Sequence, residues 1–313
     1  MPREAGYLEQ IGRTVSRRGW LLFAAMCVIW GLPYLFIRVA VEHLAPGTLV
    51  FLRTAGATVI LLPVAVARRE IGAVLARWRW LLMFALIEVM IPWLLLSDAE
   101  RHLSSSLAGL LVAAVPLVGA VAARFSQHAD PVNRSQLVGL LLGVVGVAAL
   151  VGLDFGGLNL FAILEMAVVS ICYATGPIIL ARSLADLPGL GVIAGAMAVS
   201  AVCYLPFAFL QPPRQLTGAA VGSVAVLSVV CTALAFLVFF RLVAVIGPTR
   251  STVITYVNPA VAVALGVVVL GEHVTSGMLV GFPLILAGSI IAARKSKRAP
   301  QARSEAVSPV PAA

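Results

Sequence analysis

The sequence predicts an all-α integral membrane protein with ten transmembrane helices in two inverted five-helix repeats. Three observations lead to this fold class: an extreme apolar composition, ten long apolar runs, and an internal similarity between the two halves of the chain. The 313 residues are 61% hydrophobic and 11% charged, whereas globular domains carry about 25% charged residues. Because a soluble protein of this composition could not cover its surface with polar groups, the apolar excess indicates a chain embedded in a lipid bilayer.

The apolar runs have the length of membrane-spanning helices. A helix needs about 20 apolar residues to cross the hydrocarbon core. Lipid offers the backbone no hydrogen-bond partner, so a span must be a helix or part of a closed barrel, and runs without strict alternation favour helices. Short breaks rich in Gly, Pro, Asp, Asn or Arg separate the runs. The predicted spans are residues 19–41, 47–67, 80–98, 103–124, 136–152, 159–181, 190–210, 219–241, 250–270 and 276–293.

Basic residues predict the orientation of these spans. Cytoplasmic loops of membrane proteins are enriched in Lys and Arg, and 18 of the 22 basic residues fall on one side when both termini are placed in the cytoplasm. This distribution indicates that the net charge of +9 serves contact with the membrane surface and not binding of a nucleic acid. Arginine far outnumbers lysine, which is typical of a GC-rich genome and favours a bacterial inner membrane. The segment SRRGWLL at 16–22 resembles a twin-arginine export signal, but the apolar run behind it is too long and has no A-x-A cleavage site.

The two halves of the chain share registers of Pro, Gly and Arg. A shift of about 143 residues places, within one residue, Pro116 on Pro259, Gly139 and Gly146 on Gly281 and Gly288, and Pro33 and Arg38 on Pro177 and Arg182. Each half has five spans, so the second copy would enter the membrane upside down, as in many secondary transporters; the alternative is chance agreement among similar apolar helices. The predicted organisation is a cytoplasmic segment 1–18, a first repeat 19–152, an outer linker 153–158, a second repeat 159–293 and a disordered cytoplasmic tail 294–313.

Several motifs resemble the EamA-type members of the drug/metabolite transporter superfamily. They are WGLPYLFIRVA in the first span, FLRTAGA in the second, SSSLAGLLVAAVP in the fourth, and TYVNPAVAVALGVVVLGEHVTSGMLVGFPLILAGSIIAAR across the last two. The resemblance implies ten helices in two inverted repeats and the export of amino acids, other metabolites or toxic compounds. The first repeat departs from the family pattern, because FSQHAD, with His128 and Asp130, stands where Gly-Glu is expected.

Four charged residues lie within the predicted spans and form the first part of the candidate site: Arg38, Arg53, Glu88 and Glu165. Such charges are costly in lipid and face the bundle interior or a cavity. Glu88 lies ten residues from its span end, roughly 15 Å deep, near the midplane. We hypothesise that Glu88 couples transport to protons or binds substrate, with Arg53 as counter-ion; the alternatives are a neutral Glu, a static ion pair, or an Arg53–Glu165 pair.

Arg38 and a set of polar and aromatic residues complete the candidate site. Arg38 lies near a span end, where it can snorkel to the interface or line the mouth of a pathway. Aromatic rings inside spans can stack on a substrate, although packing is the commoner role. The aromatic candidates are Trp30, Trp93, Tyr173 and Tyr256, and the polar candidate is Asn258. By contrast, Trp20, Trp78 and Trp80 stand beside Arg at span ends, which is typical of the interfacial belt.

These features favour a secondary carrier for a small-molecule substrate, working by alternating access without cofactor or metal. The sequence has no Walker A loop, and its four cysteines lie in apolar runs without metal spacing. A membrane-embedded enzyme is disfavoured because all four histidines lie in loops. A channel is disfavoured by lone midplane charges, and import cannot be separated from export. G-x-x-x-G motifs at 139–143 and 277–281 suit either a homodimer face or packing within a monomer.

Overall fold

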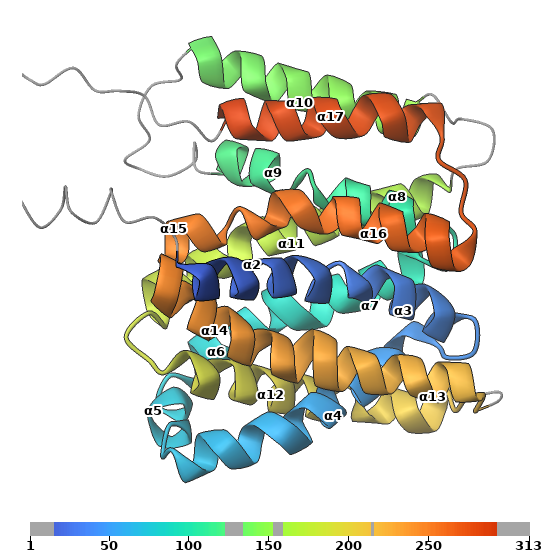
Figure 1. Cartoon of the computed structure of the whole chain (residues 1–313). Coiled ribbons are helices and arrows are strands. Elements are labelled where there is room, and N and C mark those ends of the chain that lie inside the picture. The colour runs from blue at the N-terminus through green and yellow to red at the C-terminus, as the bar shows by residue number, and fades with distance from the viewer. Residues whose placement is uncertain (1–15, 123–133, 153–158, 214–215, 293–313) are drawn as a thin grey trace, which may run out of the picture.

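The structure is a computed structural model that describes residues 16–122, 134–152, 159–213 and 216–292 (Figure 1). These residues form helices joined by short connections, and this part of the chain has no strand. The predicted cytoplasmic segment up to residue 15, the linker 153–158, the tail 294–313 and the loop with His128 and Asp130 lie outside the described residues.

The helices follow the predicted order of spans. The first half contains α2 (Arg17–Ile29), α3 (Leu32–Val41), α4 (Pro46–Ala67), α5 (Ile71–Leu75), α6 (Trp78–Ala85), η1 (Leu86–Met90), α7 (Ile91–Ala99), α8 (Ser105–Val112), α9 (Val115–Ala122) and α10 (Arg134–Gly152). The second half contains α11 (Leu160–Ser183), α12 (Gly189–Leu210), α13 (Gly218–Ala225), η3 (Val226–Leu234), α14 (Ala235–Ile246), α15 (Pro248–Ser251), α16 (Ile254–Leu270) and α17 (Ser276–Ala292). Polar side chains cap several helix starts, because the first backbone N–H groups lack helical partners: Ser16, Ser104, Asn159 and Thr217.

Within the described residues, seven helices are long and apolar enough to cross a membrane, and three shorter apolar helices accompany them. The shorter ones are Ser105–Val121, Ile254–Leu270 and Ser276–Ala292. The expectation of a multi-helix membrane protein is therefore confirmed, whereas the count of ten crossings and the inverted orientation of the repeats stay predictions. Large apolar side chains point outward from many helices, as a surface in contact with lipid requires.

The first span is interrupted at Trp30 and Gly31, between α2 and α3. Gly31 lies so close to Val261 of α16 that a Cβ at this position would collide with the valine side chain. The following Pro33 lacks an N–H group and cannot continue the hydrogen-bond ladder of α2. A close crossing and a proline therefore divide this span into two halves.

A π-helical segment interrupts the third span of each half: η1 in the first half and η3 in the second. η1 contains Glu88 and is followed by Pro92, whose missing N–H leaves the Glu88 carbonyl without its usual helical partner. η3 is longer, and its Thr232 hydroxyl donates to the carbonyl of Leu227, five residues back. Shifted by 143 residues, η1 falls within η3. π-helical turns are rare and often mark functional sites, so this pair directs attention to the middle of the bundle.

Helix pairs from the two halves lie side by side throughout the bundle (Figure 1). α4 packs on α12, α8 on α16, α7 on α11, and α2 on α14. The pair α10–α17 lies at one edge of the bundle (Figure 1). Small residues let these two helices approach closely, since a Cβ at Gly139, Gly146, Gly281 or Gly288 would meet the backbone of the other helix. These glycines thus serve packing within the chain, which is one of the two expected roles.

Candidate substrate and coupling site

A buried arginine in the second span occupies the centre of the candidate site. Arg53 of α4 is 6% exposed. Its Cζ atom lies 3.6 Å from the ring centroid of Trp93 in α7, and its Nε donates to the Thr232 hydroxyl of η3 over 3.0 Å. A cation over a desolvated indole gains about 2 kcal/mol. Arg53 is therefore held by an aromatic face and a hydroxyl, and it connects the first half of the chain to the second.

Tyr173 of α11 completes the aromatic side of this arrangement. Its hydroxyl faces the Trp93 indole and lies within electrostatic range of both Arg53 and Glu88. Four of the nine predicted site residues, drawn from three spans of the sequence, thus come together. We call Arg53, Glu88, Trp93, Tyr173 and Thr232 the central cluster.

Glu88 contributes a carboxyl group in the bundle interior to the central cluster. Its Oε2 is buried and has no hydrogen-bond partner in the described part of the chain. The carboxyl lies against Gly176 of α11, where any Cβ would collide with it. The predicted ion pair with Arg53 is absent, because the ion pairs among the described residues are Arg77–Asp186 and Arg101–Asp98. The carboxyl of Glu88 is thus available to a ligand or a proton.

Glu165 belongs to a different group of residues near the start of α11. It is 6% exposed, its carboxyl faces Asp98 of α7, and its Oε2 lacks a hydrogen-bond partner among the described residues. Asp98 in turn accepts from Arg101 over 3.0 Å. The alternative pairing of Arg53 with Glu165 is therefore also absent. Sequence reasoning passed over Asp98, although it is the last residue of a predicted span.

Arg38 is engaged by the end of α7 and does not simply extend to an interface. Its Nη1 donates to the backbone carbonyl of Glu100 over 2.6 Å. The Glu100 side chain is fully buried, and neither carboxyl oxygen has a partner in the described part of the structure. Burial raises the pKa of Glu100 well above its ordinary value and the charge of Glu272 raises it further, whereas Arg38 and Arg53 lower it.

Glu272 links the two halves of the chain at the same end of the bundle as Glu100. Its carboxylate accepts from the backbone N–H groups of Ser105 and Ser106 over 2.7 and 2.9 Å, and also from the Ser106 hydroxyl. These groups begin α8, where a carboxylate satisfies free N–H groups and interacts favourably with the helix dipole. Glu272 lies in one of the motifs that carry the family resemblance, but its contact with α8 could not be predicted from the sequence. Glu100 was missed because a Glu directly after a span resembles a solvated loop residue.

The remaining predicted residues lie where α2, α14 and α16 meet. The ring of Trp30 packs against Phe239 at 4.9 Å and Phe236 at 6.1 Å between centroids, which is aromatic packing within the core. With its amide nitrogen placed as the donor, Asn258 reaches the carbonyls of Ile254 and Cys27 at 3.1 and 3.2 Å.

Asn258 thus spans from α16 to the last turns of α2, beside the interruption of the first span. Tyr256 is half-buried on the first turn of α16. Asn258 thus supports the end of α2 at the helix break, and contact of Trp30, Tyr256 or Asn258 with a substrate stays a prediction.

Two pockets open at opposite ends of the bundle. One, of about 600 Å³, lies between the start of α6 and the end of α11. The other, of about 380 Å³, is lined by residues 41–45, Arg101 and residues 211–212. Neither of these two pockets is lined by a residue of the central cluster. Arg53, Trp93 and Thr232 of the central cluster are buried, so a substrate would reach them only after a rearrangement.

A bundle of long apolar helices with charged side chains gathered in its interior defines a multi-pass membrane protein of the transporter type. The sequence profile described as the EamA-like transporter family matches residues 17–152 and again residues 160–294, and the chain belongs to this family.

Relatives in two bacteria agree with this family. The chain is 23% identical over 294 residues to a protein of Bacillus subtilis named Uncharacterized transporter YvbV, covering 93% of this chain and 95% of that one. It is 30% identical over 261 residues to Uncharacterized inner membrane transporter YedA of Escherichia coli K12, covering 79% of this chain and 81% of that one. A solved crystal structure at 19% identity matches the fold with a TM-score of 0.61 over 88% of this chain and 96% of that chain.

Proposed function

We propose that this protein is a secondary active transporter that exports small metabolites, such as amino acids or related compounds, by proton-coupled alternating access. One observation carries the proposal: the unpartnered carboxyl of Glu88 lies in the bundle interior against Gly176 and within electrostatic range of Tyr173, which in turn faces Trp93 and Arg53, so that side chains from both halves of the chain take part. A cation, a carboxyl and aromatic faces together suit a zwitterionic substrate with an apolar part. The alternatives are an importer of the same fold and an efflux carrier for drugs or toxic compounds.

Glu88 is the proposed coupling residue because its carboxyl is both central and unpaired. A carboxylate in the membrane interior is costly unless a proton or a counter-charge neutralises it. Arg53 is already occupied by Trp93 and Thr232, so it leaves the Glu88 carboxyl free to exchange a proton or to accept from a substrate ammonium group. The π-helical turn around Glu88 gives this segment a second helical register to adopt.

The proposed location is the inner membrane of a bacterium, with both termini in the cytoplasm. The name of the E. coli relative supports the membrane, and the distribution of basic residues supports the orientation. In that orientation the contact of Glu272 with α8 closes the outer end of the bundle. Alternating access would require this contact between the two halves to break when the carrier opens outward.

The test is a thermal-unfolding screen of the purified full-length protein against amino acids, nucleosides, sugars and cationic drugs. A ligand at 100 times its Kd stabilises the native state by about 2.7 kcal/mol. We expect a stabilising ligand whose effect is lost in Glu88→Gln and kept in Glu42→Gln, an exposed carboxylate that serves as the matched control. Uptake of this ligand into proteoliposomes should respond to an imposed pH gradient in the wild type and in Glu42→Gln, and not in Glu88→Gln. Uptake with unchanged pH dependence in Glu88→Gln would refute the coupling role.

A further inference from the structure

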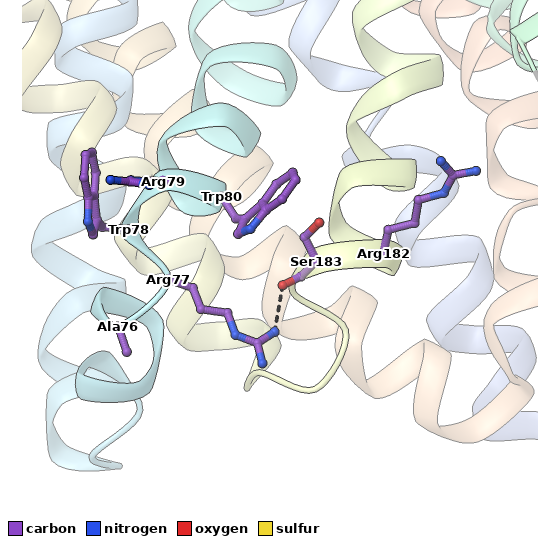
Figure 2. Close-up of a pocket in the computed structure, with 7 residues that line it drawn as sticks. All are labelled: Ala76, Arg77, Trp78, Arg79, Trp80, Arg182 and Ser183. Carbon is purple, nitrogen blue, oxygen red and sulfur yellow. Dashed lines mark hydrogen bonds between the residues drawn. The ribbon is translucent and has the colours of Figure 1, made fainter. Parts of the chain in front are cut away.

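The larger pocket lies where two helices from different halves end close together. It has a volume of about 600 Å³ and is lined by Ala76, Arg77, Trp78, Arg79, Trp80, Arg182 and Ser183. In Figure 2 Trp80 projects from the start of α6 toward α11, and Arg182 projects from the last turn of α11. No residue of the central cluster lines the pocket. Its chemistry is therefore separate from that of the proposed transport site.

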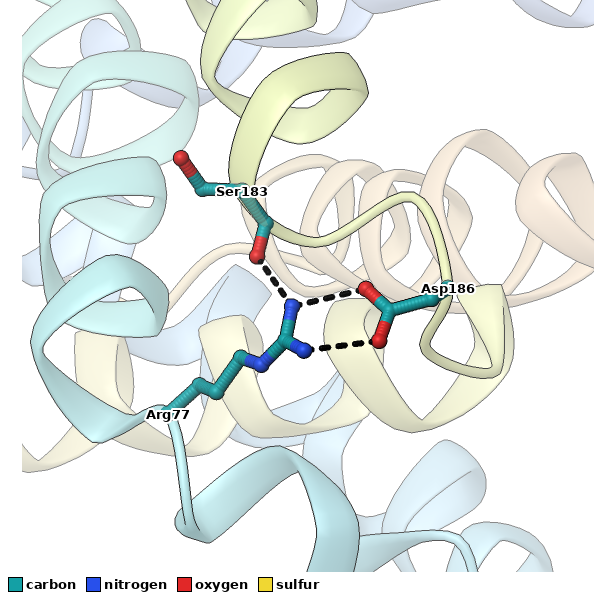
Figure 3. A network of polar contacts seen from close by, with 3 residues as sticks. All are labelled: Arg77, Ser183 and Asp186. Carbon is teal, nitrogen blue, oxygen red and sulfur yellow. Dashed lines mark hydrogen bonds and ion pairs between the residues drawn. The ribbon is translucent and has the colours of Figure 1, made fainter.

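Only one of the three arginines in this pocket is neutralised by a carboxylate of the described chain. Arg77 donates through Nη1 and Nη2 to the two carboxylate oxygens of Asp186, each over 2.7 Å, and through Nη1 to the Ser183 carbonyl over 2.8 Å (Figure 3). The ion pairs of the described residues include neither Arg79 nor Arg182. Arg79 lies over the Trp78 ring at 5.5 Å. Among the described residues, the pocket thus has two positive charges without a carboxylate partner.

The side chains around the same pocket are of the kind that lies at the boundary between lipid and water. Trp78 and Trp80 are 55% and 44% exposed, and indole rings favour the headgroup level of a membrane. Leu82, Met83 and Leu86 follow on the same span and are also exposed, as side chains facing acyl chains would be. A molecule in the pocket would therefore meet arginines at its polar end and an apolar helix surface beside it.

We propose that this pocket binds the phosphate-bearing headgroup of an anionic phospholipid. Guanidinium groups bind phosphate oxygens through charge-assisted hydrogen bonds, and basic pockets between helices on the cytoplasmic side suit anionic lipid headgroups. Arg79 and Arg182 come from the first and second halves of the chain and lie on opposite sides of Trp80 (Figure 2), so a headgroup in the pocket would lie between these halves next to the Arg77–Asp186 ion pair. The proposal rests on the membrane orientation proposed above and does not depend on what the protein transports.

The test measures lipid binding to the purified full-length protein in detergent by native mass spectrometry. The protein is titrated with phosphatidylglycerol, with phosphatidylcholine of the same acyl chains, and with inorganic phosphate as a competitor of the bound phosphatidylglycerol. The test variant combines Arg79→Gln with Arg182→Gln. Both residues line the pocket, and neither takes part in an ion pair of the described residues. The matched control is Arg241→Gln, an exposed arginine of α14 that does not line the pocket.

We expect phosphatidylglycerol to bind at least tenfold more tightly than phosphatidylcholine. Each basic side chain near an anionic lipid surface contributes about a fivefold change in affinity, so the double variant should raise the Kd about 30-fold while the control leaves it unchanged. Equal binding of the two lipids, or an unchanged Kd in the double variant, would overturn the proposal. Displacement of the lipid by inorganic phosphate at equal concentration would also overturn it, because the site would then take a free anion.

Discussion

The hydrogen bond from Arg53 to Thr232 should couple the two halves of the chain energetically. Thr232→Val keeps the side-chain shape but removes the hydroxyl that accepts from the Arg53 Nε over 3.0 Å. Hydrogen bonds to charged groups contribute about 1.5–3 kcal/mol in proteins generally, whereas side-chain hydrogen bonds inside membrane proteins average about 0.6 and reach about 1.7 kcal/mol. Because this bond is buried and charge-assisted, we expect the upper end of the membrane range, about 1.5 kcal/mol.

A double-mutant cycle isolates this coupling energy from the other contacts of Arg53. The free energy of unfolding is measured by SDS titration for the wild type, Thr232→Val, Arg53→Met and the double variant. Thr54→Val is the matched control, because the buried Thr54 hydroxyl donates only to carbonyls of its own helix. Additive effects of Thr232→Val and Arg53→Met, within about 0.3 kcal/mol, would refute the idea that this bond holds Arg53 in place.

Three further predictions concern side chains around the interior. Gly176→Ala should destabilise the protein, because the new methyl group collides with the carboxyl of Glu88, and Glu88→Ala should restore the thermal stability of this variant. Glu272→Gln should cost about 1–3 kcal/mol of unfolding free energy, because a charge-assisted acceptor at the start of α8 becomes neutral; a melting temperature equal to that of Glu42→Gln would contradict this. Folding raises the pKa of Glu100, so the native state retains a proton that the unfolded chain releases, and stability should fall as pH rises above about 4.5. Thermal unfolding between pH 5 and 8 should show this decline in the wild type and a smaller one in Glu100→Gln.

The arrangement of the helices could be predicted largely from sequence because lipid permits few solutions. Backbone groups must be satisfied within each span, so the apolar runs located the helices, and their observed ends lie within a few residues of the expected ones. The largest difference between a predicted and an observed helix end is in the eighth span, which was predicted to end at residue 241 and continues to Ile246. Arg241 is exposed at this helix, so a charge near a span end did not end the helix there.

The candidate site could be predicted only where a charge stood out against its surroundings. Arg53 and Glu88 were found because ionised side chains are rare in apolar runs, yet the residue that accepts a hydrogen bond from Arg53 was not. Thr232 is 179 residues from Arg53 in the chain, and a threonine in an apolar run gives no signal of what it will contact. Pairing by charge sign was also misleading here, since Arg53 is held by an aromatic ring and a hydroxyl in place of a carboxylate.

Contacts between the two halves differ in strength along the bundle, and this difference bears on how a carrier of this fold would move. At one end the Arg77–Asp186 pair has side chains that are 42% and 62% exposed, and such exposed pairs contribute at most about 1 kcal/mol. At the other end the Glu272 carboxylate receives three donors at the start of α8, and hydrogen bonds to a charged group contribute about 1.5–3 kcal/mol each. From this conformation the end with Arg77 therefore separates at the lower cost, and a lipid headgroup bound in the pocket beside this pair would raise that cost on the same side.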